Sequence, residues 1–153
     1  MITKLPENIR NYIEKDGTAL LDGYLRFLKK EEIRLFHEML EKGSIWNAGI
    51  PFATTVFGDV LAWEDGYVML YKMPEADYTV MLSGTTFLFE NLKDASYQAD
   101  YFNLDLYNEA QKKLGKVQSN ECYVIEPIPA LGGAREINYL STGDMKTYLY
   151  LLI

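Results

Sequence analysis

The stretch PFATTVFGDVLAWEDGYVMLYKM, residues 51–73, decides the fold class of this chain. It holds two apolar runs joined by Asp65 and Gly66, a dipeptide that is typical of the tight turn in a β-hairpin. In the second run, tyrosine and methionine alternate with valine and leucine, so successive side chains fall on opposite faces of a strand. The stretch therefore predicts an antiparallel hairpin in the middle of the chain.

Further strands and helices surround this hairpin. Turn residues and apolar runs predict extended segments at residues 22–28, 77–82 and 122–128, and a short strand after the loop that begins at Gly132. Apolar residues at helical spacing, with suitable capping residues, predict helices at residues 6–17, 30–43, 85–94 and 102–115. The order of elements indicates a single α+β domain, residues 1–153, in which helices flank a hairpin-rich antiparallel sheet of about five strands.

The C-terminal segment GDMKTYLYLLI, residues 143–153, is apolar on almost all sides. Met145 and Tyr148 share one face at helical spacing, whereas Tyr150 and Leu151 cover the opposite face. A helix of this kind is either buried or in contact with a partner, and the sequence leaves both interpretations open. A homodimer is also compatible with such a segment.

Length and cysteine content set the class of protein. The 153 residues suit one domain that buries a sizeable core. The single cysteine excludes an intramolecular disulfide and fits a reducing compartment. The first residues lack the apolar stretch of a signal peptide, and no segment is apolar for the length of a membrane span. We therefore expect a cytoplasmic protein that does not enter a membrane.

Charge is distributed unevenly along the chain, whose formal net charge is −7. Residues 58–110 hold ten acidic and two basic side chains, whereas acids and bases nearly balance in the rest. This pattern argues against direct binding of nucleic acid, because phosphate recognition needs a basic surface. It favours a cationic partner. The alternative is a solvated acidic surface that only keeps the protein soluble.

A lone cysteine near a glycine pair raises the alternative of a nucleophile beside an oxyanion pocket. The residues are Cys122 and the glycines at 132–133. The single histidine, His37, is predicted to lie on the polar side of a helix, so a histidine base is not expected beside the thiol. Glu121 and Glu126 would raise the thiol pKa. We therefore predict that Cys122 is a small buried apolar residue.

The chain also lacks the residues of common cofactor sites. One cysteine and one histidine cannot form a tetrahedral zinc shell. The carboxylates within residues 100–109 do not match the spacing of a calcium loop, and no phosphate-binding glycine motif is present. We predict no metal, no cofactor and no enzymatic activity. A pair of carboxylates acting as acid and base is the remaining catalytic alternative.

Tyrosines alternate with aspartates in the acidic part of the chain. Tyrosine anchors protein interfaces and acids supply selectivity for a basic partner, so this mixture predicts a protein-binding surface. The residues predicted to bind the partner are Asp59, Glu64, Asp65, Glu90, Asp94, Tyr97, Asp100, Tyr101 and Asp105.

A combination of short motifs carries a resemblance to a known family. The motifs are Gly58-Asp59 and Trp63 in a strand, Leu114-Gly115 at a helix end, Asn120-Glu121-Cys122-Tyr123 in a strand, and Pro129-Ala130-Leu131-Gly132-Gly133 in a loop. In this combination the chain resembles the C-terminal domain of type VI secretion DNase-immunity proteins over about residues 57–153. Residues 6–77 resemble more loosely the GAD-like segment that often precedes this domain.

The resemblance implies an immunity protein that binds and neutralises a cognate secreted toxin by occluding it. It also implies that the Cys-Tyr strand and the Gly-Gly loop are framework. Because a nuclease toxin must carry a basic surface to hold DNA, the acidic middle of the chain and the resemblance favour the same kind of partner. The alternative is a small non-enzymatic interaction or regulatory module with another partner.

Overall fold

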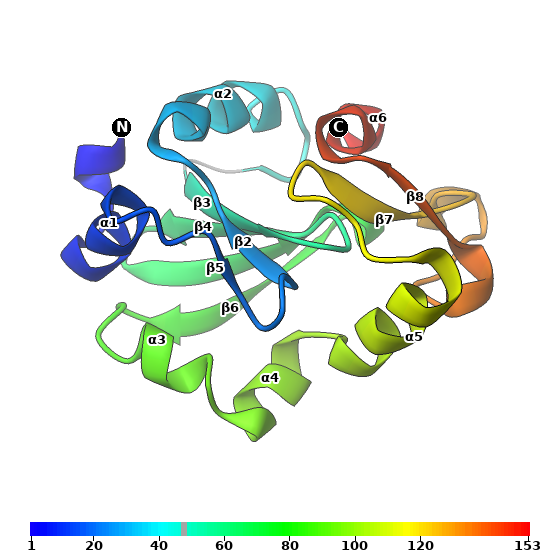
Figure 1. Ribbon diagram of the computed structural model, residues 1–153. Helices are drawn as coiled ribbons and strands as arrows, with labels where there is room; N and C mark the ends of the chain where they lie inside the picture. Colours follow the sequence, from blue (N-terminus) through cyan, green and yellow to red (C-terminus); the bar gives the residue numbers. More distant parts are fainter. Residues whose placement is uncertain (47–48) are drawn as a thin grey trace.

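Six antiparallel strands form the main sheet, in the spatial order β1-β2-β3-β4-β5-β6. The computed structural model describes residues 1–46 and 49–153, and Figure 1 shows its elements. The strands are β1 (Ala19–Leu20), β2 (Leu25–Phe27), β3 (Ile50–Thr55), β4 (Val60–Glu64), β5 (Tyr67–Lys72) and β6 (Asp77–Ser83). Because the order in space follows the order in the chain, each strand pairs with its neighbours in sequence.

The predicted hairpin is confirmed as β4 and β5. Glu64 pairs with Tyr67 at the end of the ladder. The two turn residues between them, Asp65 and Gly66, have φ angles of 55° and 88°. A two-residue turn with positive φ at both positions matches the twist of the strands, which explains the preference for Asp-Gly here.

Helices surround the sheet. They are α1 (Glu7–Glu14), α2 (Lys30–Leu40), α3 (Leu88–Asn91), α4 (Ala95–Tyr101), α5 (Leu104–Leu114) and α6 (Met145–Leu152). Short 3-10 turns lie at Ile2–Lys4, Met73–Glu75, Pro129–Leu131 and Ile137–Tyr139. All of the predicted helices are present, and α4 is an additional helix.

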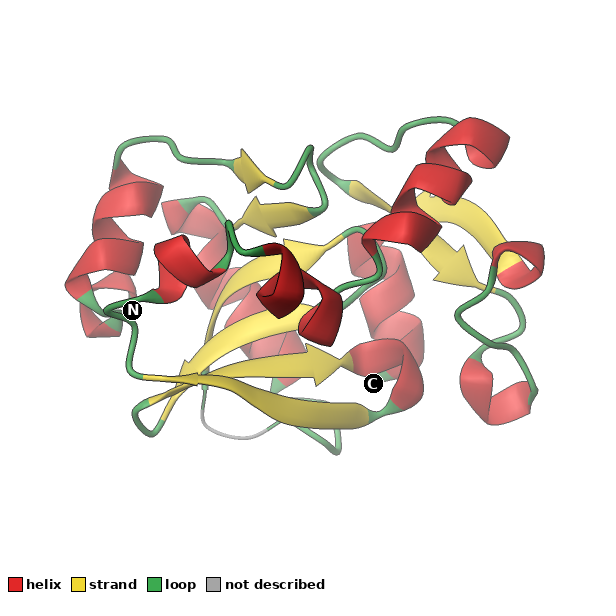
Figure 2. Ribbon diagram, turned by 90° about the horizontal axis from the view of Figure 1, so that it is seen from below, coloured by secondary structure: helices red, strands yellow, loops and turns green. Residues whose placement is uncertain are grey.

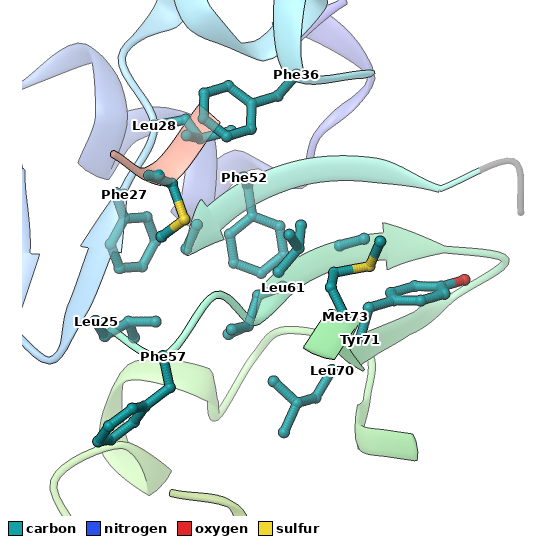
Figure 3. Close-up of a cluster of buried hydrophobic side chains, with 14 of the residues drawn as sticks. Leu25, Phe27, Leu28, Phe36, Phe52, Phe57, Leu61, Leu70, Tyr71 and Met73 are labelled. Atoms are coloured by element: carbon teal, nitrogen blue, oxygen red, sulfur yellow. The ribbon is translucent and has the colours of Figure 1, made fainter. Parts of the chain in front are cut away.

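The core lies between the main sheet and its helices. Phe36 of α2 lies above Phe52 of β3 in Figure 3, and Leu61 of β4 and Leu70 of β5 belong to the same cluster. These four side chains are at most 4% exposed. The apolar stripe that predicted α2 therefore faces the central strands.

A second sheet pairs β7 (Glu121–Ile125) with β8 (Leu140–Asp144), and Cys122 lies opposite Gly143. Figure 2 shows this sheet at one end of the larger one. The backbone N–H of Tyr123 donates to the carbonyl of Val56 at 2.7 Å and joins the two sheets. The α+β class and the flanking helices are thus confirmed, with six strands in one sheet and two in another.

Helix α6 follows β8 directly and resolves the two interpretations of the apolar tail. Met145, Tyr148 and Leu149 are buried, whereas Tyr150 and Leu151 are 54% and 71% exposed. The helix is therefore core on one face and uncovered on the other. Within residues 1–46 and 49–153, no helix is both long and apolar enough to cross a bilayer.

Candidate functional site

Cys122 is fully buried in β7, as predicted. Burial raises the pKa of its thiol to about 12, so the thiolate is scarce at neutral pH. His37 differs from the prediction of a surface residue: its side chain is only 14% exposed on α2, and Nδ1 lies 3.5 Å from a carboxylate oxygen of Glu41. Neither residue has the surroundings of an activated nucleophile or base.

Metal ligands are not gathered in the part of the chain that the structure describes. There, no three of the histidine, cysteine, aspartate and glutamate side chains are placed to hold one ion. The acids in this region belong to separate helices, Asp100 to α4 and Asp105 and Glu109 to α5, and Asp94 caps α4. The absence of a cofactor remains a prediction.

The most concentrated group of charges is a buried cluster around Arg135. Its guanidinium donates to both carboxylate oxygens of Asp59, at 2.9 and 2.7 Å, and to both of Glu75, at 2.9 and 2.7 Å. Thr55 Oγ1 donates to Asp59 at 2.8 Å, and the guanidinium lies 5.5 Å from the Phe57 ring centre. Each of the two carboxylates is paired with the same guanidinium, so the cluster joins the turn before β4, the turn after β5 and the loop after β7.

This arrangement corrects the expectation for Asp59. The sequence predicts Asp59 on a partner-binding surface, but the residue is only 1% exposed. Asp59 lies in the turn just before β4, and two hydrogen bonds from Arg135 hold its carboxylate inward. A buried carboxylate that is already paired has little to offer to an outside partner.

Glu64 and Asp65 lie together at the tip of the β4–β5 hairpin. Asp65 is exposed, whereas Glu64 is half-buried and accepts a short hydrogen bond from the Tyr71 hydroxyl. They are separated in the chain from the other predicted residues by β5 and β6. The hairpin tip is therefore a smaller acidic site of its own.

The other six predicted residues lie on α3, α4 and α5, which follow one another along the side of the molecule below β6 in Figure 1. Glu90, Asp94, Asp100 and Asp105 are all exposed. Asp94 is also the N-cap of α4, because its carboxylate accepts from the Tyr97 backbone N–H at 3.0 Å. We call these four carboxylates the acidic face.

The two tyrosines between these acids are half-buried and fasten α4 to β6. The Tyr97 hydroxyl donates to the carbonyl of Met81 at 2.8 Å, and the Tyr101 hydroxyl donates to that of Val80 at 3.4 Å. The ring centres lie 4.9 Å apart. Burial, followed by the neighbouring Tyr101, raises the pKa of Tyr97 to about 12. These tyrosines support the acidic face, and only their outer edges are open to a partner.

Sequence reasoning missed a groove on a different part of the surface. It lies between α6, the end of β7 and the loop after β7, and it encloses about 430 Å³. Leu131 and Leu151 stand at its sides and are 74% and 71% exposed. The motif Pro129–Gly133 gave a local signal for a turn, but nothing in the sequence indicated that this turn stands beside the C-terminal helix.

The two glycines of this loop are required for different reasons: Gly132 has a φ of 103°, which favours glycine, and Gly133 is closely packed. A Cβ atom at Gly133 would overlap the carbonyl oxygen of Pro127 and crowd the side chain of Ile125. The pair at 132–133 thus lets the loop fold back on β7. The expectation that the Gly-Gly loop and the Cys122 strand are framework agrees with this packing.

Known proteins are related to the chain in sequence and in fold. Residues 83–153 match the family model described as T6SS immunity protein Tdi1, C-terminal. No curated protein matches the chain. The crystal structure of Atu4351 from Agrobacterium tumefaciens superimposes with a TM-score of 0.73 and 19% sequence identity, over 97% of this chain and 75% of that one. At this identity the likeness shows the fold alone. The match over residues 83–153, a little under half of the chain, supports a relation of this segment to the type VI secretion immunity family that the model describes.

Proposed function

We propose that this protein binds a cognate type VI secretion toxin and neutralises it in the cell that makes both. The observation that carries the proposal is the family match over residues 83–153. That segment contains α3 to α6 and the second sheet. It therefore includes both the acidic face and the groove. We place this activity in the cytoplasm, where a toxin made by the same cell would first meet the protein.

The proposed partner is a toxin with a basic surface, and a nuclease fits best. A nuclease needs cationic side chains to hold the phosphates of its substrate. The formal net charge of −7 and the four exposed carboxylates of the acidic face favour such a surface and disfavour nucleic acid itself. Opposite charge mainly accelerates association and helps to exclude wrong partners.

Neutralisation is proposed to occur by occlusion, without chemistry on the toxin. The buried thiol of Cys122, the half-buried His37 and the internally paired Arg135 cluster favour a binding protein over an enzyme. Within this proposal, residues 6–77 form the GAD-like part and residues 57–153 form the immunity part of one domain. The hydrogen bond from Tyr123 to Val56 joins these parts.

A growth assay tests the proposal. The toxin encoded next to this gene is expressed in a susceptible bacterium, with or without this protein. Rescue of growth, together with a stable complex of the purified proteins and loss of the toxin's nuclease activity in that complex, is the expected result. Failure to rescue and failure to bind would overturn the immunity function and leave the alternative of a regulatory module. Rescue without any nuclease activity in the free toxin would overturn only the choice of toxin class.

A further inference from the structure

The groove beside α6 is an apolar surface that the fold leaves uncovered. It is lined by Val124 and Ile125 of β7, by Leu131 of the loop after β7 and by Leu151 of α6. Leu131 and Leu151 are 74% and 71% exposed, so both contribute apolar area to solvent at this groove. Such apolar surfaces at a concave site commonly mark places where another molecule binds.

The walls of the groove are held in place by specific contacts. Tyr148 of α6 accepts a hydrogen bond at its hydroxyl from the Ile125 backbone N–H at 3.1 Å, which fixes the helix to β7. The opposite wall belongs to the loop after β7, which Arg135 anchors to Asp59. Gly133 allows that loop to pack against Pro127. The groove is thus preformed, and little ordering is needed when it binds a ligand.

The charges at the groove favour a basic ligand over an acidic one. Among the described residues that line it, Glu126 and Asp144 are exposed carboxylates, of which Asp144 also caps α6 through Thr147, and no lysine or arginine is present. An apolar hollow with two carboxylates at its edge complements an apolar side chain whose neighbours are basic. It disfavours an acidic peptide, because like charges would face each other across a partly desolvated surface.

We propose that this groove is the anchoring site for the toxin, and that it receives an apolar side chain of the toxin that is flanked by lysine or arginine. This inference rests on the proposed function and assigns different kinetic roles to two surfaces. The acidic face lies on α3 to α5 and increases the association rate. The groove excludes water from apolar contacts and thereby sets the dissociation rate.

Peptide titrations test the chemistry of the groove without the toxin. The ¹⁵N-labelled protein is titrated with millimolar acetyl-Lys-Leu-Leu-Lys-amide, and its amide signals are followed by NMR. The expected shifts are concentrated in residues 124–131 and 142–151. Peptides with serine in place of leucine, or with glutamate in place of lysine, are expected to cause much smaller shifts. No shift in these segments, or equal shifts with the control peptides, would overturn the inference.

Exposed substitutions then test the anchor in the complex. Leu131→Ser and Leu151→Ser are combined, and Leu35→Ser is the matched control, because Leu35 is 54% exposed on α2 and does not line the groove. With the inactivated toxin encoded next to this gene as the probe, the double variant is expected to dissociate about tenfold faster or more. Its association rate and its melting temperature are expected to stay close to those of the control.

The charge at the rim is tested in the same assay. Glu126→Lys is expected to weaken binding more than Glu38→Lys, a substitution of an exposed acid on α2. If the unaltered protein binds the toxin and the groove variants dissociate like their controls, the anchoring site is wrong and the proposed function stands. If the unaltered protein does not bind the toxin, the proposed function fails, and the peptide titrations still decide whether the groove takes an apolar-basic ligand.

Discussion

Arg135 and Asp59 are 76 positions apart in the chain, yet they share two hydrogen bonds, from Nη1 to Oδ2 at 2.9 Å and from Nη2 to Oδ1 at 2.7 Å. The side chains are 9% and 1% exposed. This pair connects the start of the central hairpin with the loop that forms one wall of the groove. A pair of opposite charges in this geometry is costly to separate, because each charge has lost its water.

Removal of Arg135 is therefore expected to destabilise the fold strongly. Arg135→Met leaves Asp59 buried without its cation, and we expect a loss of about 3–5 kcal/mol in the free energy of unfolding. Lys116→Met is the control, because its ion pair with Asp22 is exposed and screened by solvent, so little stability should be lost. Urea unfolding of the three proteins measures both losses. Equal losses would show that the buried ion pair of Arg135 contributes no more to stability than the exposed ion pair of Lys116.

Replacement of Cys122 tests its structural role. Cys122→Ala removes one buried sulfur atom, and we expect a loss of about 1–2 kcal/mol in unfolding free energy with protection against the toxin retained. Because burial raises the thiol pKa to about 12, the native protein is also expected to react very slowly with dithiobis(nitrobenzoate) at pH 8, and quickly in denaturant. Loss of protection in a folded variant would indicate a functional thiol.

Reversal of the acidic face is expected to slow toxin association. Glu90→Lys, Asp100→Lys and Asp105→Lys are combined, and Asp94 is kept because it caps α4. We expect the association rate at low salt to fall about tenfold. The effect should fade at high salt, because mobile ions screen exposed charges.

The control for this variant reverses three exposed acids on α1 and α2, which are Glu14, Glu31 and Glu38. Both triple variants change the net charge by the same amount, so only the position of the charges differs. Surface plasmon resonance at several salt concentrations gives the rates. Equal slowing by the two variants would mean that net charge alone governs association.

The cap of α6 gives a prediction with a defined pH dependence. Asp144 Oδ2 accepts from the backbone N–H and the hydroxyl of Thr147, both at 2.9 Å, and these bonds lower the pKa of its carboxyl from 3.8. The folded state thus favours the ionised form. Asp144→Ala should cost about 1 kcal/mol at pH 7. The difference should shrink as pH falls below 3.8 through the lowered pKa, because the carboxyl then becomes protonated in both states.

Asp144→Asn is the matched variant for this measurement, because asparagine also caps helices well. It should retain most of the stability at pH 7 while losing the pH dependence. Denaturant unfolding at a series of pH values separates the two variants. A loss in Asp144→Ala that stays constant down to pH 2 would exclude the charged cap as its cause.

Independence from metal ions is also a prediction. Thermal melts in excess chelator are expected to match untreated melts, since a bound ion would stabilise the folded state by mass action. A fall of several degrees would reveal an ion site. The comparison needs protein purified without chelator, so that any natural ion is still present.

Local signals in the sequence were sufficient for most of the elements. Asp65-Gly66 predicted the hairpin because its φ angles are a property of the turn itself. Helix α4 was missed because none of its residues is fully buried, so it has no apolar stripe at helical spacing. Its one local signal was Asp94, which is a suitable N-cap residue.

The site was less predictable than the fold, because it depends on contacts between distant segments. The sequence predicted the exposed acids of α3 to α5, because a charged residue type alone favours exposure to solvent. It misplaced Asp59, whose burial depends on Arg135, and it did not reveal the groove, whose walls come from the loop after β7 and from α6. Pairings over such distances leave no periodic pattern in one sequence.

The hydroxyls of Tyr97 and Tyr101 have a consequence for self-association. β6 is an outer strand of the main sheet, and the free edge of such a strand can act as a template on which other chains add strands. The two hydroxyls donate hydrogen bonds to the carbonyls of Met81 and Val80. These bonds hold α4 against that stretch of β6. An incoming strand would have to displace α4 to reach these carbonyls. One short helix thus presents acids to solvent while it engages two carbonyl groups of this outer strand.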